Sequence, residues 1–284
     1  MHYYLQKEEF NIVGGSLVSL FSRRSPWEAE LTKLQNQENR WIDKRREKKE
    51  TRLNHFLETK VPERLQDTLD AAFAKAFGLV FEKGTDVIEK TYRKGEKEKE
   101  FQINQYAAGT RENKQSVRQF SKEAKNTGRK HVALSGVSGI GLGALGIGIP
   151  DIPVFTAMML RNIYEMALAY GFSYDTKEER YFILLLIQGA VSYGEELIDI
   201  NKKMNAFMEK PSLPSGYSQE VMVKETARHL SRELLYMKFL QGIPVAGAIG
   251  GAYDVIYMKN VTDYGKLKYG QRFYKNELAK RGKA

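Results

Sequence analysis

The chain has 284 residues, enough to bury a sizeable core, and its 42% hydrophobic and 28% charged residues are ordinary for a soluble globular protein. It contains no cysteine, which excludes disulfide bonds and thiolate chemistry and agrees with a reducing cytoplasm. The net charge of +10 indicates a negatively charged partner: nucleic acid, anionic lipid headgroups or an acidic protein surface.

The first 25 residues are predicted to form a loosely attached extension, and residues 26–284 a single helical domain. The apolar run Ile12–Phe21 is too short, and too broken by glycine, for the core of a secretory signal, so we expect no export. Ser25 before Pro26, with Glu28 in the first turn, is typical of a helix start.

Several helices are predicted before the centre of the chain. One begins at Pro62, because apolar residues recur there at spacings of three and four: Leu65, Leu69, Ala72, Phe73 and Ala76. The strongly polar segment Tyr92–Gln105 is predicted to be a linker or an exposed turn. A short helix is expected before Gly128.

The second half of the chain also reads as helical. Thr176 and Glu179 have the spacing of a capping box, which predicts a helix continuing to Met208. A loop over 210–219 and a helix over 220–239 should follow. Because alternating apolar patterns are nearly absent, we predict an all-α fold, a multi-helix globular bundle.

Two glycine-rich apolar segments stand out, Val132–Ile149 and Leu240–Met258. The first carries no charge and is followed by a break at Pro150 and Pro153, so it should form a central apolar helical hairpin. We expect the two segments to pack together, since both contain the G-x-x-x-G spacing of close helix contacts: Gly139 and Gly143, then Gly247 and Gly251. Plain packing, two membrane spans, and partial insertion or a lipid-holding cavity remain open alternatives.

Three parts of the sequence carry a family resemblance: Gly146–Phe172, Ile243–Asp254 and the basic, aromatic C-terminal helix. In these parts the sequence resembles the EcsC family, and the resemblance covers roughly Trp27 to the end. It departs at Asp254, where many relatives have asparagine. The resemblance implies an all-helical bacterial protein linked to an ABC transporter operon, with no established reaction. It also implies binding of fatty acyl chains or lipids at the inner face of the membrane.

The residues themselves fit such a role. An acyl chain gains about 0.8 kcal/mol per buried CH₂ and needs an apolar lining more than polar contacts. The candidate lining consists of glycines of the two segments with nearby aromatic, methionine and leucine side chains: Gly139, Gly143, Gly146, Phe155, Met158, Met159, Met166, Phe172, Phe182, Leu185, Gly247 and Gly251.

Arg161 is the most informative polar residue of this region, because a charge in the middle of an apolar helix is costly unless it is paired. Its candidate partners are Asp151, Glu165 and Asp254. We favour a structural ion pair over the alternative, in which the guanidinium holds a ligand carboxylate or phosphate.

The C-terminal residues, which interleave aromatic and basic side chains, are predicted to meet anionic headgroups. The basic residues expected at this membrane surface are Lys259, Lys266, Lys268, Arg272 and Lys275.

Other chemistry has little support. Gly141, Gly143 and Gly146 match a dinucleotide fingerprint formally, but Pro150 would cut the helix that such a site requires. The four histidines have no metal spacing, and no helix-turn-helix or stacking platform for nucleic acid is evident. No cofactor or metal is therefore expected.

The sequence thus predicts a non-enzymatic, cytoplasmic protein, peripheral on the inner face of the cell membrane, which binds lipid and is linked to an ABC transporter. A transporter adaptor without a lipid ligand and an integral protein with two spans are the alternatives.

Overall fold

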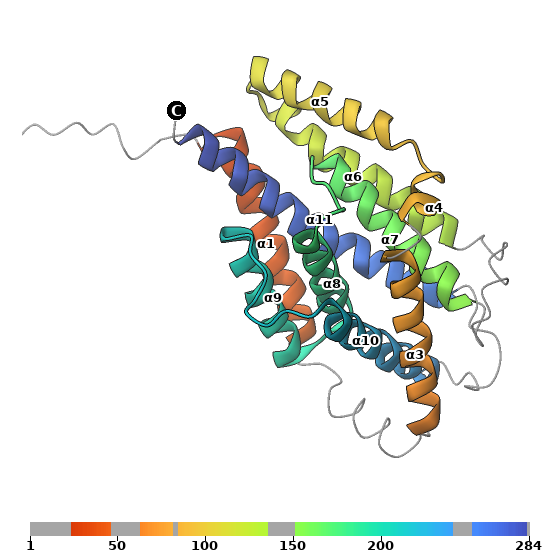
Figure 1. The fold of residues 1–284 in the computed structure, drawn as a ribbon. Helices are drawn as coiled ribbons and strands as arrows, with labels where there is room; N and C mark the ends of the chain where they lie inside the picture. The colour runs from red at the N-terminus through yellow and green to blue at the C-terminus, as the bar shows by residue number, and fades with distance from the viewer. Residues whose placement is uncertain (1–23, 47–62, 82–84, 136–150, 241–251, 283–284) are drawn as a thin grey trace, which may run out of the picture.

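The computed structural model describes residues 24–46, 63–81, 85–135, 151–240 and 252–282 (Figure 1). All regular structure within these ranges is helical, which confirms the predicted all-α bundle. The helices are α1 (Pro26–Arg46), α3 (Glu63–Leu79), α4 (Thr85–Glu89), α5 (Lys94–Thr110), α6 (Lys114–Ser135), α7 (Asp151–Ala169), α8 (Lys177–Val191), α9 (Gly194–Glu209), α10 (Gln219–Leu240) and α11 (Ala252–Arg281). Among the described helices, none is long and apolar enough to cross a bilayer.

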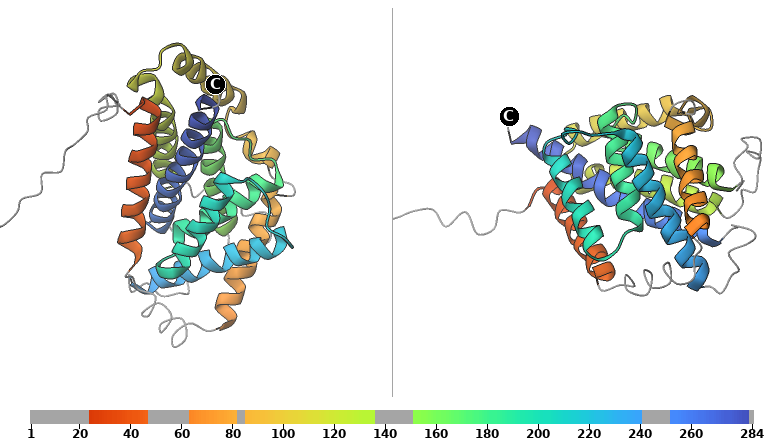
Figure 2. Two further views of the ribbon diagram at one scale, coloured as in Figure 1. Left: turned by 90° about the vertical axis from the view of Figure 1, so that its left-hand side faces the viewer. Right: turned by 60° about the horizontal axis from the view of Figure 1, so that its bottom comes forward.

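The C-terminal helix α11 is the centre of the bundle. It packs against α1, α6, α7 and α8, while α10 joins α3 to α8 (Figures 1 and 2). Nearly every residue of α11 from Tyr257 to Tyr274 is buried or half-buried, charged ones included. A helix enclosed on all sides must satisfy its polar side chains internally.

Two helix starts predicted from the sequence are confirmed by their hydrogen bonds. At α1 the Glu28 N–H donates to Ser25 Oγ at 3.2 Å, and the Ser25 N–H donates to Glu28 Oε2 at 2.8 Å. At α8 the Glu179 N–H donates to Thr176 Oγ1 at 3.1 Å. Each cap satisfies backbone donors that have no partner inside the helix.

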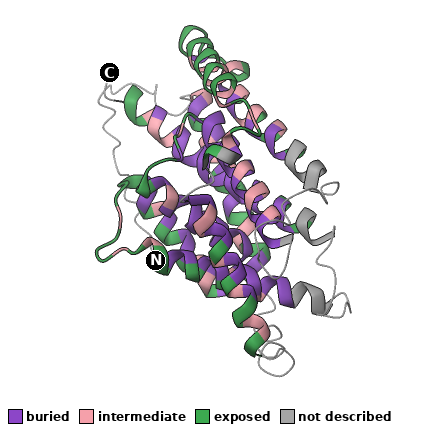
Figure 3. Cartoon of the chain, turned by 45° about the vertical axis from the view of Figure 1, so that its right-hand side comes forward, coloured by how far each residue is buried: buried purple, intermediate pink, exposed green. Residues whose placement is uncertain are grey.

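The prediction of a linker over 92–105 is wrong, because α5 occupies most of this segment. Its Lys, Glu and Gln residues are strong helix formers, although they show no apolar periodicity. The helix is exposed along most of its length (Figure 3), and Phe101 anchors it by packing against Phe120 and Phe273.

Two other boundaries differ from prediction. The helix expected to end before Gly128 continues as α6 to Ser135. Glycine at 128 marks a close contact inside this helix, because a side chain there would collide with Thr262 of α11. The helix expected to run to Met208 breaks after Val191. Gly194 has a φ of 56°, in the left-handed region that favours glycine, and α9 starts in a new direction there.

Two separate glycine-to-alanine variants test how closely α8 and α11 pack against each other. A Cβ atom at Gly189 would lie 2.5 Å from Cε1 of Tyr264, whose ring stacks on Trp41 and whose hydroxyl donates to Asn201 Oδ1. Gly189→Ala should therefore destabilise the fold by about 1–3 kcal/mol in urea unfolding. Gly109→Ala, at a helical site with nothing within 4 Å, should instead stabilise it by about 0.5–1 kcal/mol. Equal effects at both sites would contradict the tight packing.

Candidate functional site

Arg161, on α7, has the predicted partner on its own helix. Its Nε donates to Glu165 Oε1 at 2.9 Å, and its guanidinium lies 5.9 Å from the ring centroid of Tyr92. The Arg161 side chain is 29% exposed and that of Glu165 is 9% exposed. The pairing confirms the Arg161–Glu165 part of the predicted network, whereas the side chains of Asp151 and Asp254 lie outside the described residues.

A hydrogen-bonded tyrosine cluster beside Arg161 was missed by the sequence interpretation. The Tyr92 hydroxyl donates to the Tyr174 hydroxyl, which donates to Glu89 Oε1, each at 2.6 Å. Lys94 Nζ donates to the same carboxylate oxygen at 3.0 Å. Burial, followed by the hydrogen bond to Glu89, raises the pKa of Tyr174, so this hydroxyl stays protonated. The cluster ties α4, the turn after it and the start of α5 to the connection between α7 and α8.

The predicted lipid-lining side chains that the structure describes belong largely to the protein core. Met159, Met166, Phe182 and Leu185 are fully buried, Phe155 is 8% exposed, and Met158 and Phe172 are partly buried. Met166 Cε lies 2.7 Å from where a Cβ of Gly265 would stand, so α7 and α11 touch here without intervening space. Gly139, Gly143, Gly146, Gly247 and Gly251 lie outside the described residues, and the ligand role of the whole set stays a prediction.

Lys268 is not at the surface, and its prediction as a membrane-contacting residue is wrong. Its side chain is 0% exposed and pairs with Glu38 of α1, while Nζ also donates to Asn205 Oδ1 at 3.0 Å. Burial lowers the pKa of Lys268 to about 8. Burial acts to raise the pKa of Glu38, but the charge and hydrogen bonds of Lys268 and Gln271 outweigh it and hold that pKa below its ordinary value.

Arg272 is likewise enclosed rather than exposed to a membrane. Its Nη1 donates to Glu179 Oε2 at 2.6 Å, and Tyr269 donates to the other oxygen at 2.8 Å. The guanidinium lies 4.2 Å from the ring centroid of Phe172 and 4.9 Å from that of Phe182. These two aromatic residues, predicted to line a lipid cavity, therefore contact a buried cation.

The other three predicted surface cations remain accessible to different degrees. Lys259 is 65% exposed and pairs with Asp263 at 2.6 Å, and Lys266 is 21% exposed near the same carboxylate. Lys275 is 31% exposed, with Nζ 4.0 Å from Glu209 Oε1. Because Lys268 and Arg272 are buried, the predicted membrane-contacting set keeps only Lys259, Lys266 and Lys275 as accessible cations.

Helix α7 begins just after the first glycine-rich segment and α11 begins within the second, and the two helices start side by side. The rings of Phe155, near the start of α7, and Tyr257, near the start of α11, meet edge to face at 6.2 Å. Two turns further along α7, Asn162 Nδ2 donates to Thr262 Oγ1 at 2.8 Å. The Asn162 Oδ1 and Thr156 Oγ1 atoms are buried without a hydrogen-bond partner within the described ranges. We call this region, where α7 and α11 begin, the glycine-flanked end.

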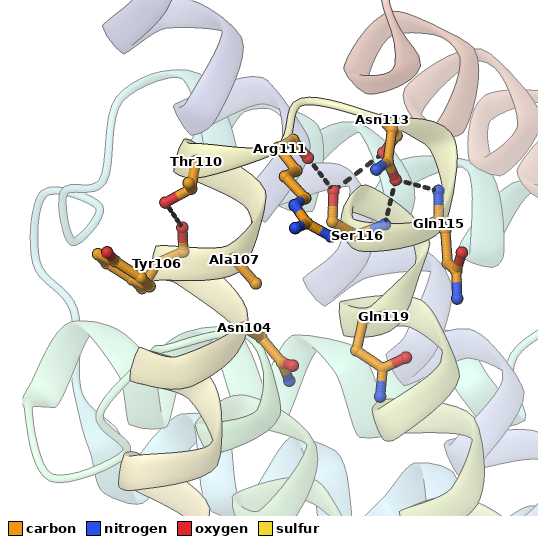
Figure 4. A pocket seen from close by; sticks show the side chains of 9 residues that line it. All are labelled: Asn104, Tyr106, Ala107, Thr110, Arg111, Asn113, Gln115, Ser116 and Gln119. Carbon is orange, nitrogen blue, oxygen red and sulfur yellow. Dashed lines mark hydrogen bonds between the residues drawn. The ribbon is translucent and has the colours of Figure 1, made fainter.

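A separate polar pocket of about 530 Å³ lies at the turn between α5 and α6 (Figure 4). It is lined by amide, hydroxyl and other side chains: Asn104, Tyr106, Ala107, Thr110, Arg111, Asn113, Gln115, Ser116 and Gln119. Asn113 Oδ1 accepts the N–H groups of Gln115 and Ser116, both at 2.9 Å. Asn113 thus caps the start of α6. The pocket is formed mainly by the turn between α5 and α6.

Comparison with known proteins places the chain in a family. No solved structure matches it significantly. It is 25% identical over 162 residues to the uncharacterized protein YdbA of Bacillus subtilis (strain 168), a match that covers 52% of this chain and only 56% of that protein. The model of the EcsC protein family matches residues 27–273. With most of its length matched, the chain belongs to the EcsC family.

Proposed function

We propose that the protein is a non-enzymatic, cytoplasmic protein that attaches to the inner face of the cell membrane and binds fatty acyl chains or lipids. The observation that carries the proposal is the contact between Phe155 and Tyr257. Through it, two sequence segments rich in glycine and poor in charge both lead into one end of a helical bundle.

The distribution of polarity supports this proposal. The segment before α7 has no charge over 132–149, whereas α1, α5 and α6 carry charged residues along their lengths. An uncharged run joined to charged helices gives the chain an amphiphilic sequence, and acyl chains gain about 0.8 kcal/mol for each CH₂ that they bury in apolar surroundings. The Thr156 hydroxyl oxygen, which is near the start of α7 and has no hydrogen-bond partner within the described ranges, offers an acceptor to a hydroxyl or protonated carboxyl group there.

The functional link to an ABC transporter is a further part of the proposal. It rests on family membership, and Lys275 of α11, which is partly exposed, is the side chain through which a contact with an acidic protein surface would be tested.

Lipid should therefore accompany the protein through purification. Native mass spectrometry and solvent extraction of protein purified without added lipid should find fatty acid or phospholipid in a stoichiometric amount. Phe155→Asp, which places a charge beside Tyr257, should lower that amount at least about tenfold. The matched control is Ile103→Asp on the exposed face of α5, which should leave it unchanged.

Two outcomes would contradict the proposal. Protein without lipid that still binds a transporter would favour the adaptor alternative. Protein that stays with the membrane after alkaline carbonate extraction would favour the alternative with two spans, because carbonate releases a peripheral protein.

A further inference from the structure

Helix α6 carries a stripe of basic side chains on one face. Arg118, Lys122, Lys125 and Arg129 follow one another at spacings of four, three and four residues, which places them in line on a helix. All four are exposed. The acidic residue Glu123 between them lies on another face, where it accepts a hydrogen bond from Lys97 of α5 at 3.0 Å.

Helix α11 adds two lysines to this stripe. It runs antiparallel to α6, since Tyr274 donates to Val117 O at 2.9 Å near one end and Gly128 lies against Thr262 and Lys266 toward the other. Lys266 and Lys259 therefore stand beside the second half of α6. Burial, together with the positive charges of Lys125 and Lys259, lowers the pKa of Lys266 against the attraction of Asp263.

The positive charge of this surface is only partly compensated. Arg118 pairs with Glu30, and Lys259 and Lys266 share Asp263. Lys122, Lys125 and Arg129 have no ion pair within the part of the chain that the structure describes. We call the set Arg118, Lys122, Lys125, Arg129, Lys259 and Lys266 the basic face.

We infer that the basic face is the surface on which the protein rests against an anionic lipid bilayer, with its cations contacting headgroup phosphates. The inference rests on the membrane attachment proposed above. It replaces the predicted surface that included Lys268 and Arg272, which are buried in ion pairs.

The shape of the face favours a bilayer over other anionic partners. From Arg118 to Arg129 the stripe is straight and extends about 16 Å, so all its cations can meet one flat plane of headgroups when α6 lies along the membrane. The stripe has no interleaved aromatic side chain of the kind that stacks on nucleic acid bases. It also points along α6 toward Ser135, after which the sequence is uncharged up to Ile149.

The test is flotation of the full-length protein with vesicles of phosphatidylcholine alone or mixed with an equal amount of phosphatidylglycerol. A variant with Lys122→Glu, Lys125→Glu and Arg129→Glu should bind the mixed vesicles at least about 100-fold more weakly, at roughly fivefold for each cation lost. The matched control reverses three exposed lysines elsewhere, Lys99→Glu, Lys203→Glu and Lys210→Glu, and should change binding less than tenfold. If the reversed variant does not fold, the neutral variant with Lys122→Gln, Lys125→Gln and Arg129→Gln gives the same test.

The remaining outcomes separate this inference from the proposed function. Equal losses in both variants, or no loss in either, would overturn the basic face while leaving membrane attachment intact. So would equal binding of the unaltered protein to both vesicle compositions. Binding to neither composition would remove the proposed attachment as well. Tighter binding to duplex DNA than to mixed vesicles, lost in the same variant, would assign the face to nucleic acid instead.

Discussion

Replacing Lys268 with methionine is expected to destabilise the protein by about 3–5 kcal/mol, because it leaves the carboxylate of Glu38 buried without its cation. Gln271 Nε2 would still donate to Glu38 Oε2 at 2.7 Å, but one neutral donor does not replace a charge. The free energy of unfolding in urea at pH 7 measures the effect, and a loss below 1 kcal/mol would mean that the pair is solvated in solution.

The double variant Lys268→Met and Glu38→Leu provides the control. Burial lowers the pKa of Lys268 to about 8, which shows that the enclosed charge is held at a cost. Removing both charges also removes that cost, so the double variant should recover most of the stability lost in the single variant. A double variant as unstable as the single one would assign the loss to packing rather than to an unpaired charge.

Replacing Arg272 with methionine should have an effect of similar size, about 3–5 kcal/mol at pH 7. Glu179 would keep the hydrogen bond from Tyr269 but lose its cation, and Phe172 and Phe182 would lose the guanidinium between them. The control is Lys275→Met, one turn further along α11 and 31% exposed, which should cost less than about 0.5 kcal/mol.

The loss in free energy of unfolding caused by Arg272→Met should become smaller as the pH falls. Burial raises the pKa of Glu179, and the attraction of Arg272 opposes that rise, so the variant raises the pKa further. A carboxyl group with a raised pKa binds its proton more tightly in the folded chain than in the unfolded one. The folded state is therefore favoured below that pKa and loses stability as pH rises through it. The difference from the unaltered protein should shrink toward pH 5, and a constant difference from pH 5 to pH 8 would contradict this account.

Local patterns in the sequence predicted local structure well. The Ser25 and Thr176 caps were identified because a cap needs only residues three positions apart. The stripe of α3 was identified for the same reason, and Leu69, Ala72, Phe73 and Ala76 are buried as expected. α5 was missed, because a helix that buries little has no apolar period to detect.

The sequence could not predict which charges are buried. Lys268 and Arg272 lie among basic and aromatic neighbours that suggest a surface, and nothing local distinguishes them from Lys259. Lys268 is buried because it pairs with Glu38, 230 positions away in the sequence, and Arg272 is buried because it pairs with Glu179, 93 positions away. Arg161 was predictable because its partner lies four positions on in the same helix.

The manner in which α1 binds the bundle fixes its register. Glu30 pairs with Arg118 of α6, Glu38 with Lys268 of α11, and Arg45 Nη1 donates to the carbonyl oxygen of Ala190 at the end of α8, 3.0 Å away. Sliding α1 by a single turn would separate all three contacts together, whereas an apolar stripe would find new neighbours after the same shift. The helix α1 can thus occupy one position and no adjacent one, and the carboxy-terminal half of α11, against which α1 lies from Tyr264 to Arg281, is covered in a single arrangement.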